Sequence, residues 1–252
     1  MKPFLLIATR AQDAAADGEY QGFLRFGGLA PDQLHRVRAE TGPLPAIDLA
    51  DYSGVLIGGS PFNSSDPEVD KTLVQRRVER EIAELLDAIV AADFPFLGAC
   101  YGVGTLGRHQ GGLIDRTFAE PIGAVQITVT DAGVADPLLT GLPRTFDAFV
   151  GHKEACTTLP AGAVVLASSS SCPVQMFRIK ENLFATQFHP ELDVDALVQR
   201  IDIYRHAGYF PPEQAEDYMA RVRTTKVDQP AVILRNFVRR YAVDRTGART
   251  YA

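Results

Sequence analysis

The sequence predicts an α/β fold in which a mostly parallel sheet carries helices on both faces. Two apolar runs, Phe4–Ala8 and Gly54–Ile57, have the length of buried strands, and residues 94–97 form a third. A long helical pattern separates the second run from the third. Apolar strands that alternate with helices are typical of parallel sheets buried on both sides. The 252 residues suffice for one large domain of this kind.

The first half of the chain supplies this alternation. A polar stretch with several glycines follows the first strand to about residue 30, and a short helix is expected over residues 32–40. A long helix is predicted over residues 67–92, because Val78, Ile82 and Ile89 lie on one apolar face. Pro67 suits its first turn. A further helix is expected over residues 101–110.

The second half begins with strands at short spacing and ends in helices. We expect strands at residues 125–129, 146–150, 163–167, 174–179 and 183–188, some of which form hairpins that add antiparallel strands to the parallel sheet. Helices are expected over residues 194–206, 212–223 and 231–241. The predicted organisation is one domain over residues 1–192, with residues 193–252 as a helical C-terminal extension packed on it.

The composition excludes several classes of function. The net charge is -6, and no tract of lysine and arginine offers a surface for nucleic acid or anionic membranes. The apolar run after the N-terminus is too short for a signal peptide, and no segment has the length of a membrane span. Three cysteines without a secretion signal predict free thiols in a cytoplasmic protein.

Cys100 is the candidate nucleophile. It lies in Gly98-Ala99-Cys100-Tyr101-Gly102, between an apolar strand and a helix. A nucleophile in such a tight turn is exposed above the sheet, and the helix N-terminus is expected to favour its thiolate. Taken alone, the pattern also fits a small buried cysteine.

His189 and Glu191 are the candidate base and orienting carboxylate, because they follow the last apolar strand with Pro190 between them. Alone, this tripeptide also fits an exposed turn. A third element, Gly58-Gly59, ends another strand. The N–H of Gly59 and that of Tyr101, the residue after the cysteine, are the candidate oxyanion donors.

The segments FLGACYG at residues 96–102 and QFHPE at residues 187–191 resemble the class I (triad) glutamine amidotransferases, and most closely the free-standing homologues of the GMP synthase glutaminase domain. The resemblance implies a flavodoxin-like fold and a Cys100–His189–Glu191 triad. It implies attack on the glutamine side-chain amide, with a γ-glutamyl thioester on Cys100 and release of ammonia. No cofactor and no metal is expected.

The resemblance also implies residues that bind the substrate. Gly58, Gly151, His152 and Lys153 fall where the family holds glutamine. The family commonly has glutamine four residues after the nucleophile, but this chain has Gly104. We therefore expect weak binding of free glutamine, improved by Gly104→Gln if that residue lines the pocket. The partner expected is a synthetase that accepts ammonia, because no such domain is recognisable in this sequence.

Other interpretations remain open at this point. A γ-glutamyl hydrolase or peptidase would use the same triad without a synthetase, and a peptidase-like or deglycase-like relative would place histidine where Tyr101 stands. A non-catalytic homologue would be expected to lack a triad member. Residues 102–107 read G-x-G-x-x-G, but the elbow explains these glycines better than a dinucleotide site. Cys156 and Cys172 lack zinc-site spacing.

Overall fold

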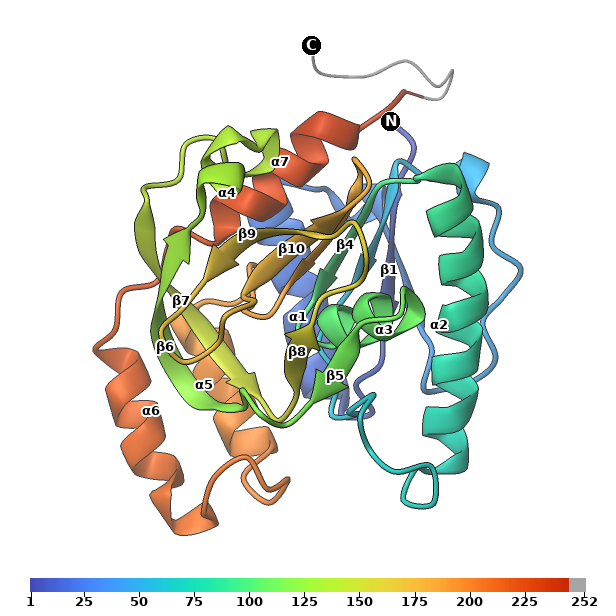
Figure 1. Ribbon diagram of the computed structural model, residues 1–252. Coiled ribbons are helices and arrows are strands. Elements are labelled where there is room, and N and C mark those ends of the chain that lie inside the picture. The colour runs from blue at the N-terminus through green and yellow to red at the C-terminus, as the bar shows by residue number, and fades with distance from the viewer. Residues whose placement is uncertain (245–252) are drawn as a thin grey trace.

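A nine-stranded sheet organises residues 1–244, the part of the chain that this computed structural model describes (Figure 1). The strand order is β2-β1-β3-β4-β11-β10-β9-β6-β7. The first five strands pair in parallel and the last four are joined by antiparallel pairing. Their bounds are β1 Phe4–Ala8, β2 Leu34–Arg38, β3 Gly54–Ile57, β4 Phe96–Ala99, β11 Leu183–Thr186, β10 Met176–Ile179, β9 Val164–Ser168, β6 Glu120–Val129 and β7 Thr145–His152. A parallel block with added antiparallel strands is the predicted α/β architecture.

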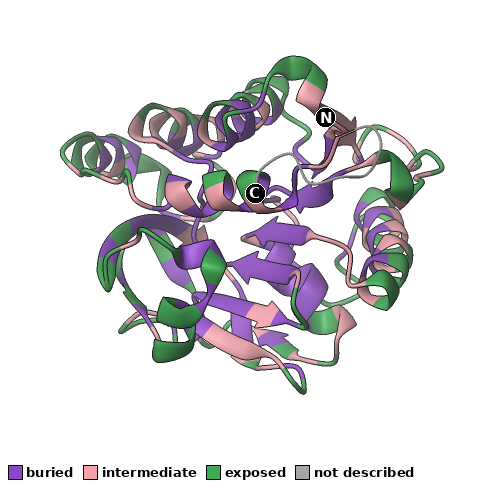
Figure 2. Cartoon of the chain, turned by 90° about the horizontal axis from the view of Figure 1, so that it is seen from above, coloured by how far each residue is buried: buried purple, intermediate pink, exposed green. Residues whose placement is uncertain are grey.

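Helices cover both faces of this sheet (Figure 1). The helices are α1 Asp13–Gly27, α2 Leu73–Ala92, α3 Tyr101–His109, α4 Asp131–Ala135, α5 Val194–Ile203, α6 Ala215–Arg223 and α7 Ala231–Tyr241. In β1, Phe4 and Leu6 pack with side chains of α1 and α7, whereas Leu5 and Ile7 pack with those of α2. Figure 2 shows the strands as the buried centre between partly exposed helices. Burial on both faces explains why these strands are uniformly apolar.

The segment before residue 40 corrects two predictions. Residues expected to form a polar loop are helix α1, and residues expected to form a helix are strand β2 after a short 3₁₀ turn. Glycines within α1 lowered its apparent helix propensity. One of them, Gly22, is required by packing, because a Cβ there would collide with the main-chain oxygen of Glu191. Strand β2 lies at the sheet edge and is half exposed, so its side chains carry little apolar periodicity.

Other boundaries shift in smaller ways. Helix α2 begins at Leu73, where the Thr72 side chain accepts from the N–H of Gln75, so Pro67 precedes the helix. The short strands β5 Leu113–Asp115 and β8 Ala155–Thr158 pair with each other and were not expected. The remaining predicted strands and helices are present with ends displaced by a few residues.

The C-terminal helices pack directly on the sheet domain. Helix α5 contacts α1, α6 contacts β6, and α7 contacts α1. Leu197, Ile201 and Phe210 share a buried cluster with Ile122 and Phe149 of β6 and β7. Within residues 1–244, no helix is long and apolar enough to cross a membrane.

The parallel strands bring the candidate residues to one edge. Four strands, β1, β3, β4 and β11, lie side by side in that order in the parallel block. Their carboxyl ends therefore point the same way. Arg10, Gly59, Cys100 and His189 follow these strands along the chain. This edge is where α/β sheets usually bind ligands.

Candidate active site

Cys100 occupies a strained turn between β4 and α3. Its backbone has φ 54 and ψ -84, a conformation that costs a non-glycine residue on the order of 1–3 kcal/mol. The turn depends on close packing, because a Cβ at Gly98 would lie 2.6 Å from the Cα of Gly102. The Cys100 N–H donates to the Thr186 carbonyl at 2.7 Å, which ties the turn to β11. The sequence predicted this elbow, and the structure contains it.

His189 and Glu191 form a buried hydrogen-bonded pair. His189 Nδ1 donates to Glu191 Oε1 at 2.7 Å, and the His189 main-chain N–H donates to the Phe149 carbonyl at 3.1 Å. The Glu191 side chain is fully buried. Because the carboxylate only accepts, the neutral ring carries its proton on Nδ1 and leaves the Nε2 lone pair free. This is the arrangement of a general base with its orienting carboxylate.

Two buried arginines, which the sequence reasoning missed, surround this pair. Arg200 of α5 donates from both terminal nitrogens to Glu191 Oε1 at 3.2 Å, and lies 3.5 Å from Glu19 Oε1. Arg10 donates from Nε to Glu19 Oε1 at 2.9 Å. Both arginines and both carboxylates are nearly inaccessible to solvent. A charged residue directly after a buried parallel strand, as Arg10 is, was the available signal.

The network sets the protonation of the pair. Burial alone would raise the pKa of Glu191, but the charge and hydrogen bond of His189, with Arg200, hold it at about 2. Burial lowers the pKa of His189, and it outweighs the opposing effect of Glu191, while Arg200 and Arg10 lower it further. An ionised carboxylate therefore orients a neutral imidazole at neutral pH.

The expectation of a favoured thiolate at Cys100 is wrong for the free protein. Burial raises the pKa of the thiol to about 12, more than the positive charge of Arg10 lowers it, and Glu154 and Glu191 raise it further. The residue is partly accessible, but its open side faces a small pocket. The helix N-terminus does not offset desolvation. The thiol must therefore lose its proton to a base during attack.

The pocket at Cys100 is small and enclosed by tyrosines. Its free volume is about 40 Å³. The pocket is lined by Arg10, Ser60, His189 and Arg200, and by Gly151 of β7. Tyr204 and Tyr209, from the connection between α5 and α6, form part of its wall. Within residues 1–244, no three histidine, cysteine or acidic side chains come together as a metal site.

The glycine loop after β3 lies against the same groups. A Cβ at Gly59 would lie 2.7 Å from His189 Cε1 and 2.5 Å from Arg10 Nη2, so glycine is required there. A Cβ at Gly58 would collide with the Glu19 carboxylate, which gives Gly58 a packing role beside the network. Tyr101 opens α3, and the N–H groups of a first helical turn lack acceptors within the helix.

Residues 151–153 were expected to hold the substrate as a backbone segment, and two of their side chains point elsewhere. His152 is buried, with Nε2 2.7 Å from the Glu120 carboxylate and Nδ1 2.9 Å from the Glu154 carbonyl. Lys153 Nζ donates to the Ala207 carbonyl at 2.7 Å. Neither side chain lines the pocket at Cys100. Of this segment only Gly151 does.

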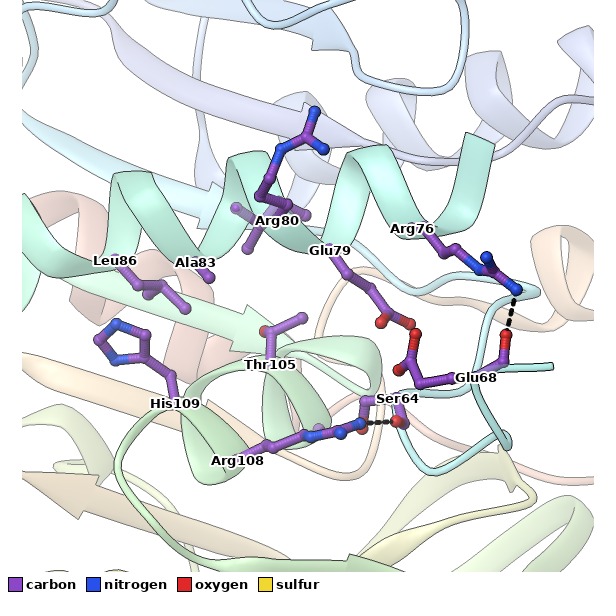
Figure 3. Close-up of a pocket in the computed structure, with 12 residues that line it drawn as sticks. Ser64, Glu68, Arg76, Glu79, Arg80, Ala83, Leu86, Thr105, Arg108 and His109 are labelled. Atoms are coloured by element: carbon purple, nitrogen blue, oxygen red, sulfur yellow. Dashed lines mark hydrogen bonds between the residues drawn. The ribbon is translucent and has the colours of Figure 1, made fainter. Parts of the chain in front are cut away.

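Gly104 does not line that pocket either. It borders a different cavity of about 300 Å³ between α2 and α3 (Figure 3). Figure 3 shows Thr105 and Arg108 of α3 facing this cavity, with Arg108 bonded to the Ser64 carbonyl. This cavity contains no member of the Cys100–His189–Glu191 set. The condition under which Gly104→Gln was expected to improve glutamine binding, that Gly104 lines the pocket, is therefore not met.

Gly104→Gln is therefore expected to impair the protein instead of improving glutamine turnover. A Cβ there would lie 2.5 Å from Glu154 Oε1 and 2.6 Å from Ser64 Oγ. Glu154 cannot move freely, because it accepts from the N–H of Ser64 at 2.9 Å and that of Ser65 at 2.7 Å. Overpacking of this kind costs about 1–3 kcal/mol. Thermal unfolding and kcat/KM for glutamine measure the effect.

The control for this change is Gly42→Gln, since a Cβ at Gly42 meets no atom within 4 Å. It should leave stability and turnover unchanged. Faster glutamine turnover by Gly104→Gln would show that this position does reach the substrate.

Comparison with known proteins assigns the family. The model described as "Glutamine amidotransferase class-I" matches residues 33–199. The chain belongs to this family. The match includes the nucleophile elbow and the His189–Glu191 pair, and it ends one residue before Arg200. Arg10, Arg200, Tyr204 and Tyr209 of this amidotransferase therefore come from outside the matched segment.

Relatives with known names include GMP synthases. The chain is 28% identical over 202 residues to the GMP synthase [glutamine-hydrolyzing] of Neisseria gonorrhoeae strain FA 1090, covering 76% of this chain and 36% of that protein. It is 32% identical over 115 residues to that of Thermosipho africanus, covering 45% of this chain and 22% of the relative. The similarity thus spans only a fifth to about a third of these relatives.

Solved structures with the same fold include two amidotransferases. A glutamine amidotransferase from Thermotoga maritima superposes with a TM-score of 0.70 and 19% identity, covering 94% of this chain and 99% of that one. A glutamine amidotransferase from Methylobacillus flagellatus gives a TM-score of 0.69 with 19% identity, covering 97% of each chain. The added helices of this amidotransferase thus fall within the superposed length.

Proposed function

We propose that this chain hydrolyses the side-chain amide of glutamine, with Cys100 as nucleophile, His189 as general base and acid, and Glu191 as the residue that orients His189. The observation that carries the proposal is that His189 lines the same pocket as the strained Cys100 and donates a hydrogen bond to the buried, ionised Glu191. Family membership and the printed activity of the GMP synthase relatives support glutamine as the substrate.

The first half-reaction forms a thioester. His189 Nε2 takes the proton from the Cys100 thiol while the sulfur bonds to the amide carbon. The same proton then passes to the amide nitrogen, the C–N bond breaks and ammonia leaves. A γ-glutamyl thioester remains on Cys100. Because burial keeps the thiol protonated, proton transfer to His189 is a required part of this step.

The second half-reaction restores the enzyme. Water gives a proton to His189 and its oxygen to the acyl carbon, the C–S bond breaks, and the proton returns to sulfur. Glutamate is released. In both halves the N–H groups of Gly59 and Tyr101 are the proposed donors to the tetrahedral oxyanion. Gly151, in the pocket wall, is the proposed main-chain contact for the substrate.

The proposed partner is a synthetase that uses the ammonia. The GMP synthase relatives extend well beyond the part that this chain matches. An acceptor site in another domain or subunit is consistent with that difference. The triad side chains do not need the partner for hydrolysis itself, so slow glutaminase activity is proposed for the chain alone.

A glutamine-like electrophile tests the nucleophile. At a limiting dose it is expected to label Cys100 and spare Cys156 and Cys172, as read by peptide mass spectrometry. Burial raises the pKa of all three thiols, so selectivity comes from access and from His189. Cys156 and Cys172 are fully buried in the core.

Release of glutamate and ammonia from glutamine is the parallel measurement, and Cys100→Ala is expected to abolish both. Equal labelling of the three cysteines would contradict the assignment. So would glutamate release that survives Cys100→Ala.

A further inference from the structure

The connection between α5 and α6 forms part of the wall of the pocket at Cys100. We call residues 204–210 the strap. Tyr204, at its start, and Tyr209, near its end, both line the pocket, and their ring centres lie 6.4 Å apart. The strap lies beyond the segment that matches the family.

The strap is anchored at both ends. The Tyr204 hydroxyl accepts from Arg10 Nη1 at 3.2 Å, and Arg10 also lies over the Tyr204 ring. At the other end Phe210 is buried against Tyr218 of α6, with ring centres 5.0 Å apart. These anchors fix the ends and leave the middle to be held by other contacts.

Two side chains hold the part of the strap between its ends: Arg205 pairs with Glu216 of α6 at 2.9 Å, and Lys153 contacts residues 207 and 209. Lys153, at the end of β7, donates from Nζ to the Ala207 carbonyl at 2.7 Å, and Nζ lies 4.5 Å from the centre of the Tyr209 ring. Between these two residues Gly208 adopts φ 76, a conformation that suits glycine. Within residues 1–244, the Tyr209 hydroxyl has no hydrogen-bond partner although it faces the Cys100 pocket. Lys153 is therefore the contact that holds the segment from Ala207 to Tyr209.

With the strap in place the pocket is too small for an ordinary ligand. Its 40 Å³ compares with the several hundred Å³ typical of small-molecule sites. The leaving amide nitrogen must lie near His189, which protonates it. His189 and Arg10 flank the same Gly59, and Arg10 is bonded to Tyr204. A group attached to the amide nitrogen would therefore meet the strap.

We propose that the strap determines which amides reach Cys100: it shifts to admit the unsubstituted amide of glutamine and excludes γ-glutamyl peptides, with Tyr209 as the specificity-determining residue and Lys153 as its latch. This inference rests on the proposed function for the identity of the substrate. The exclusion of bulky groups from Cys100 does not.

The experiment measures access and selectivity separately. Cys100 is labelled with iodoacetamide and with a bulky N-aryl maleimide in the wild type and in Tyr209→Ala, Tyr209→Phe, Lys153→Met and Lys226→Met. Lys226 is the matched control, since its side chain is 88% exposed and far from the pocket lining. The same proteins are assayed with glutamine and with a γ-glutamyl dipeptide.

Tyr209→Ala removes an aromatic wall of the pocket, and Lys153→Met removes a charge-assisted hydrogen bond to the strap. Each variant is expected to raise labelling by the bulky reagent about tenfold. Labelling by iodoacetamide should change by less than about twofold. Both variants should gain turnover of the dipeptide. Tyr209→Phe keeps the aromatic wall and should not raise labelling by the bulky reagent. Lys226→Met should behave as the wild type.

Equal bulky labelling in all five proteins overturns the strap, even if glutamine is hydrolysed. A wild type that cleaves the dipeptide as fast as glutamine overturns the selectivity. If labelling follows the expected pattern but no protein releases glutamate from glutamine, the strap stands and the proposed function fails.

Discussion

His189→Ala is expected to lower kcat/KM for glutamine by about 10²–10⁴-fold, the usual contribution of a general base. In the proposed mechanism the base acts in both half-reactions. Burial holds the pKa of the Cys100 thiol at about 12, so no preformed thiolate compensates for its loss. Glutamate release under steady-state conditions measures the effect.

Glu191→Ala is expected to be less severe, at roughly 10- to 100-fold, because it removes one charged hydrogen bond to His189 and leaves the base in place. Glu191→Gln keeps the shape of the side chain and separates lost charge from lost packing. Glu181→Ala is the control, since that side chain is 79% exposed. A silent Glu191→Ala beside an inactive His189→Ala would reduce the triad to a Cys100–His189 dyad.

Arg200→Met is expected to be the most destabilising single change in the network. It would leave Glu191 and Glu19 buried, and each of these carboxylates already has one oxygen without a hydrogen-bond partner. Removing one member of a buried ion pair costs about 3–5 kcal/mol. For a protein of this size, that lowers Tm by roughly 10 °C.

The activity of Arg200→Met should also shift with pH. Arg200 lowers the pKa of His189, so its loss raises that pKa, and the acid limb of kcat/KM should move to higher pH. Arg144→Met is the matched control, because Arg144 pairs with Asp131 on the surface, where such pairs contribute about 1 kcal/mol or less. An unchanged Tm together with an unchanged pH profile in Arg200→Met would mean that Arg200 contributes neither to stability nor to the pKa of His189.

The local motifs were predictable because their residues are adjacent in sequence. Cys100 lies between an apolar strand and a helix, and His189 and Glu191 follow the next strand of the parallel block, so pattern and spacing were sufficient to select them. Arg10, Glu19 and Arg200 come from three separate segments. No local pattern marks such a network, because it exists only once α1 and α5 pack together.

Two errors have a common physical cause. Gly22 made residues 13–27 look unlike a helix, yet it is what lets α1 approach the backbone of Glu191. The helix N-terminus suggested a thiolate at Cys100, but desolvation by the same packing is the stronger effect. Local propensity and local dipoles were each outweighed by tertiary burial.

The network around Glu191 has a consequence for how this chain can be divided. Two arginines and two carboxylates are buried together, and their formal charges cancel. One arginine and one carboxylate come from the first 19 residues, the other carboxylate from near the end of the family segment, and the second arginine from just beyond it. A module excised at residue 199, or grafted onto another amidotransferase, would carry a net buried charge next to its catalytic base. The buried charges therefore balance only when the N-terminal helix, the family segment and the end of α5 are present together. A fusion that separates them would have to replace charged residues at both ends.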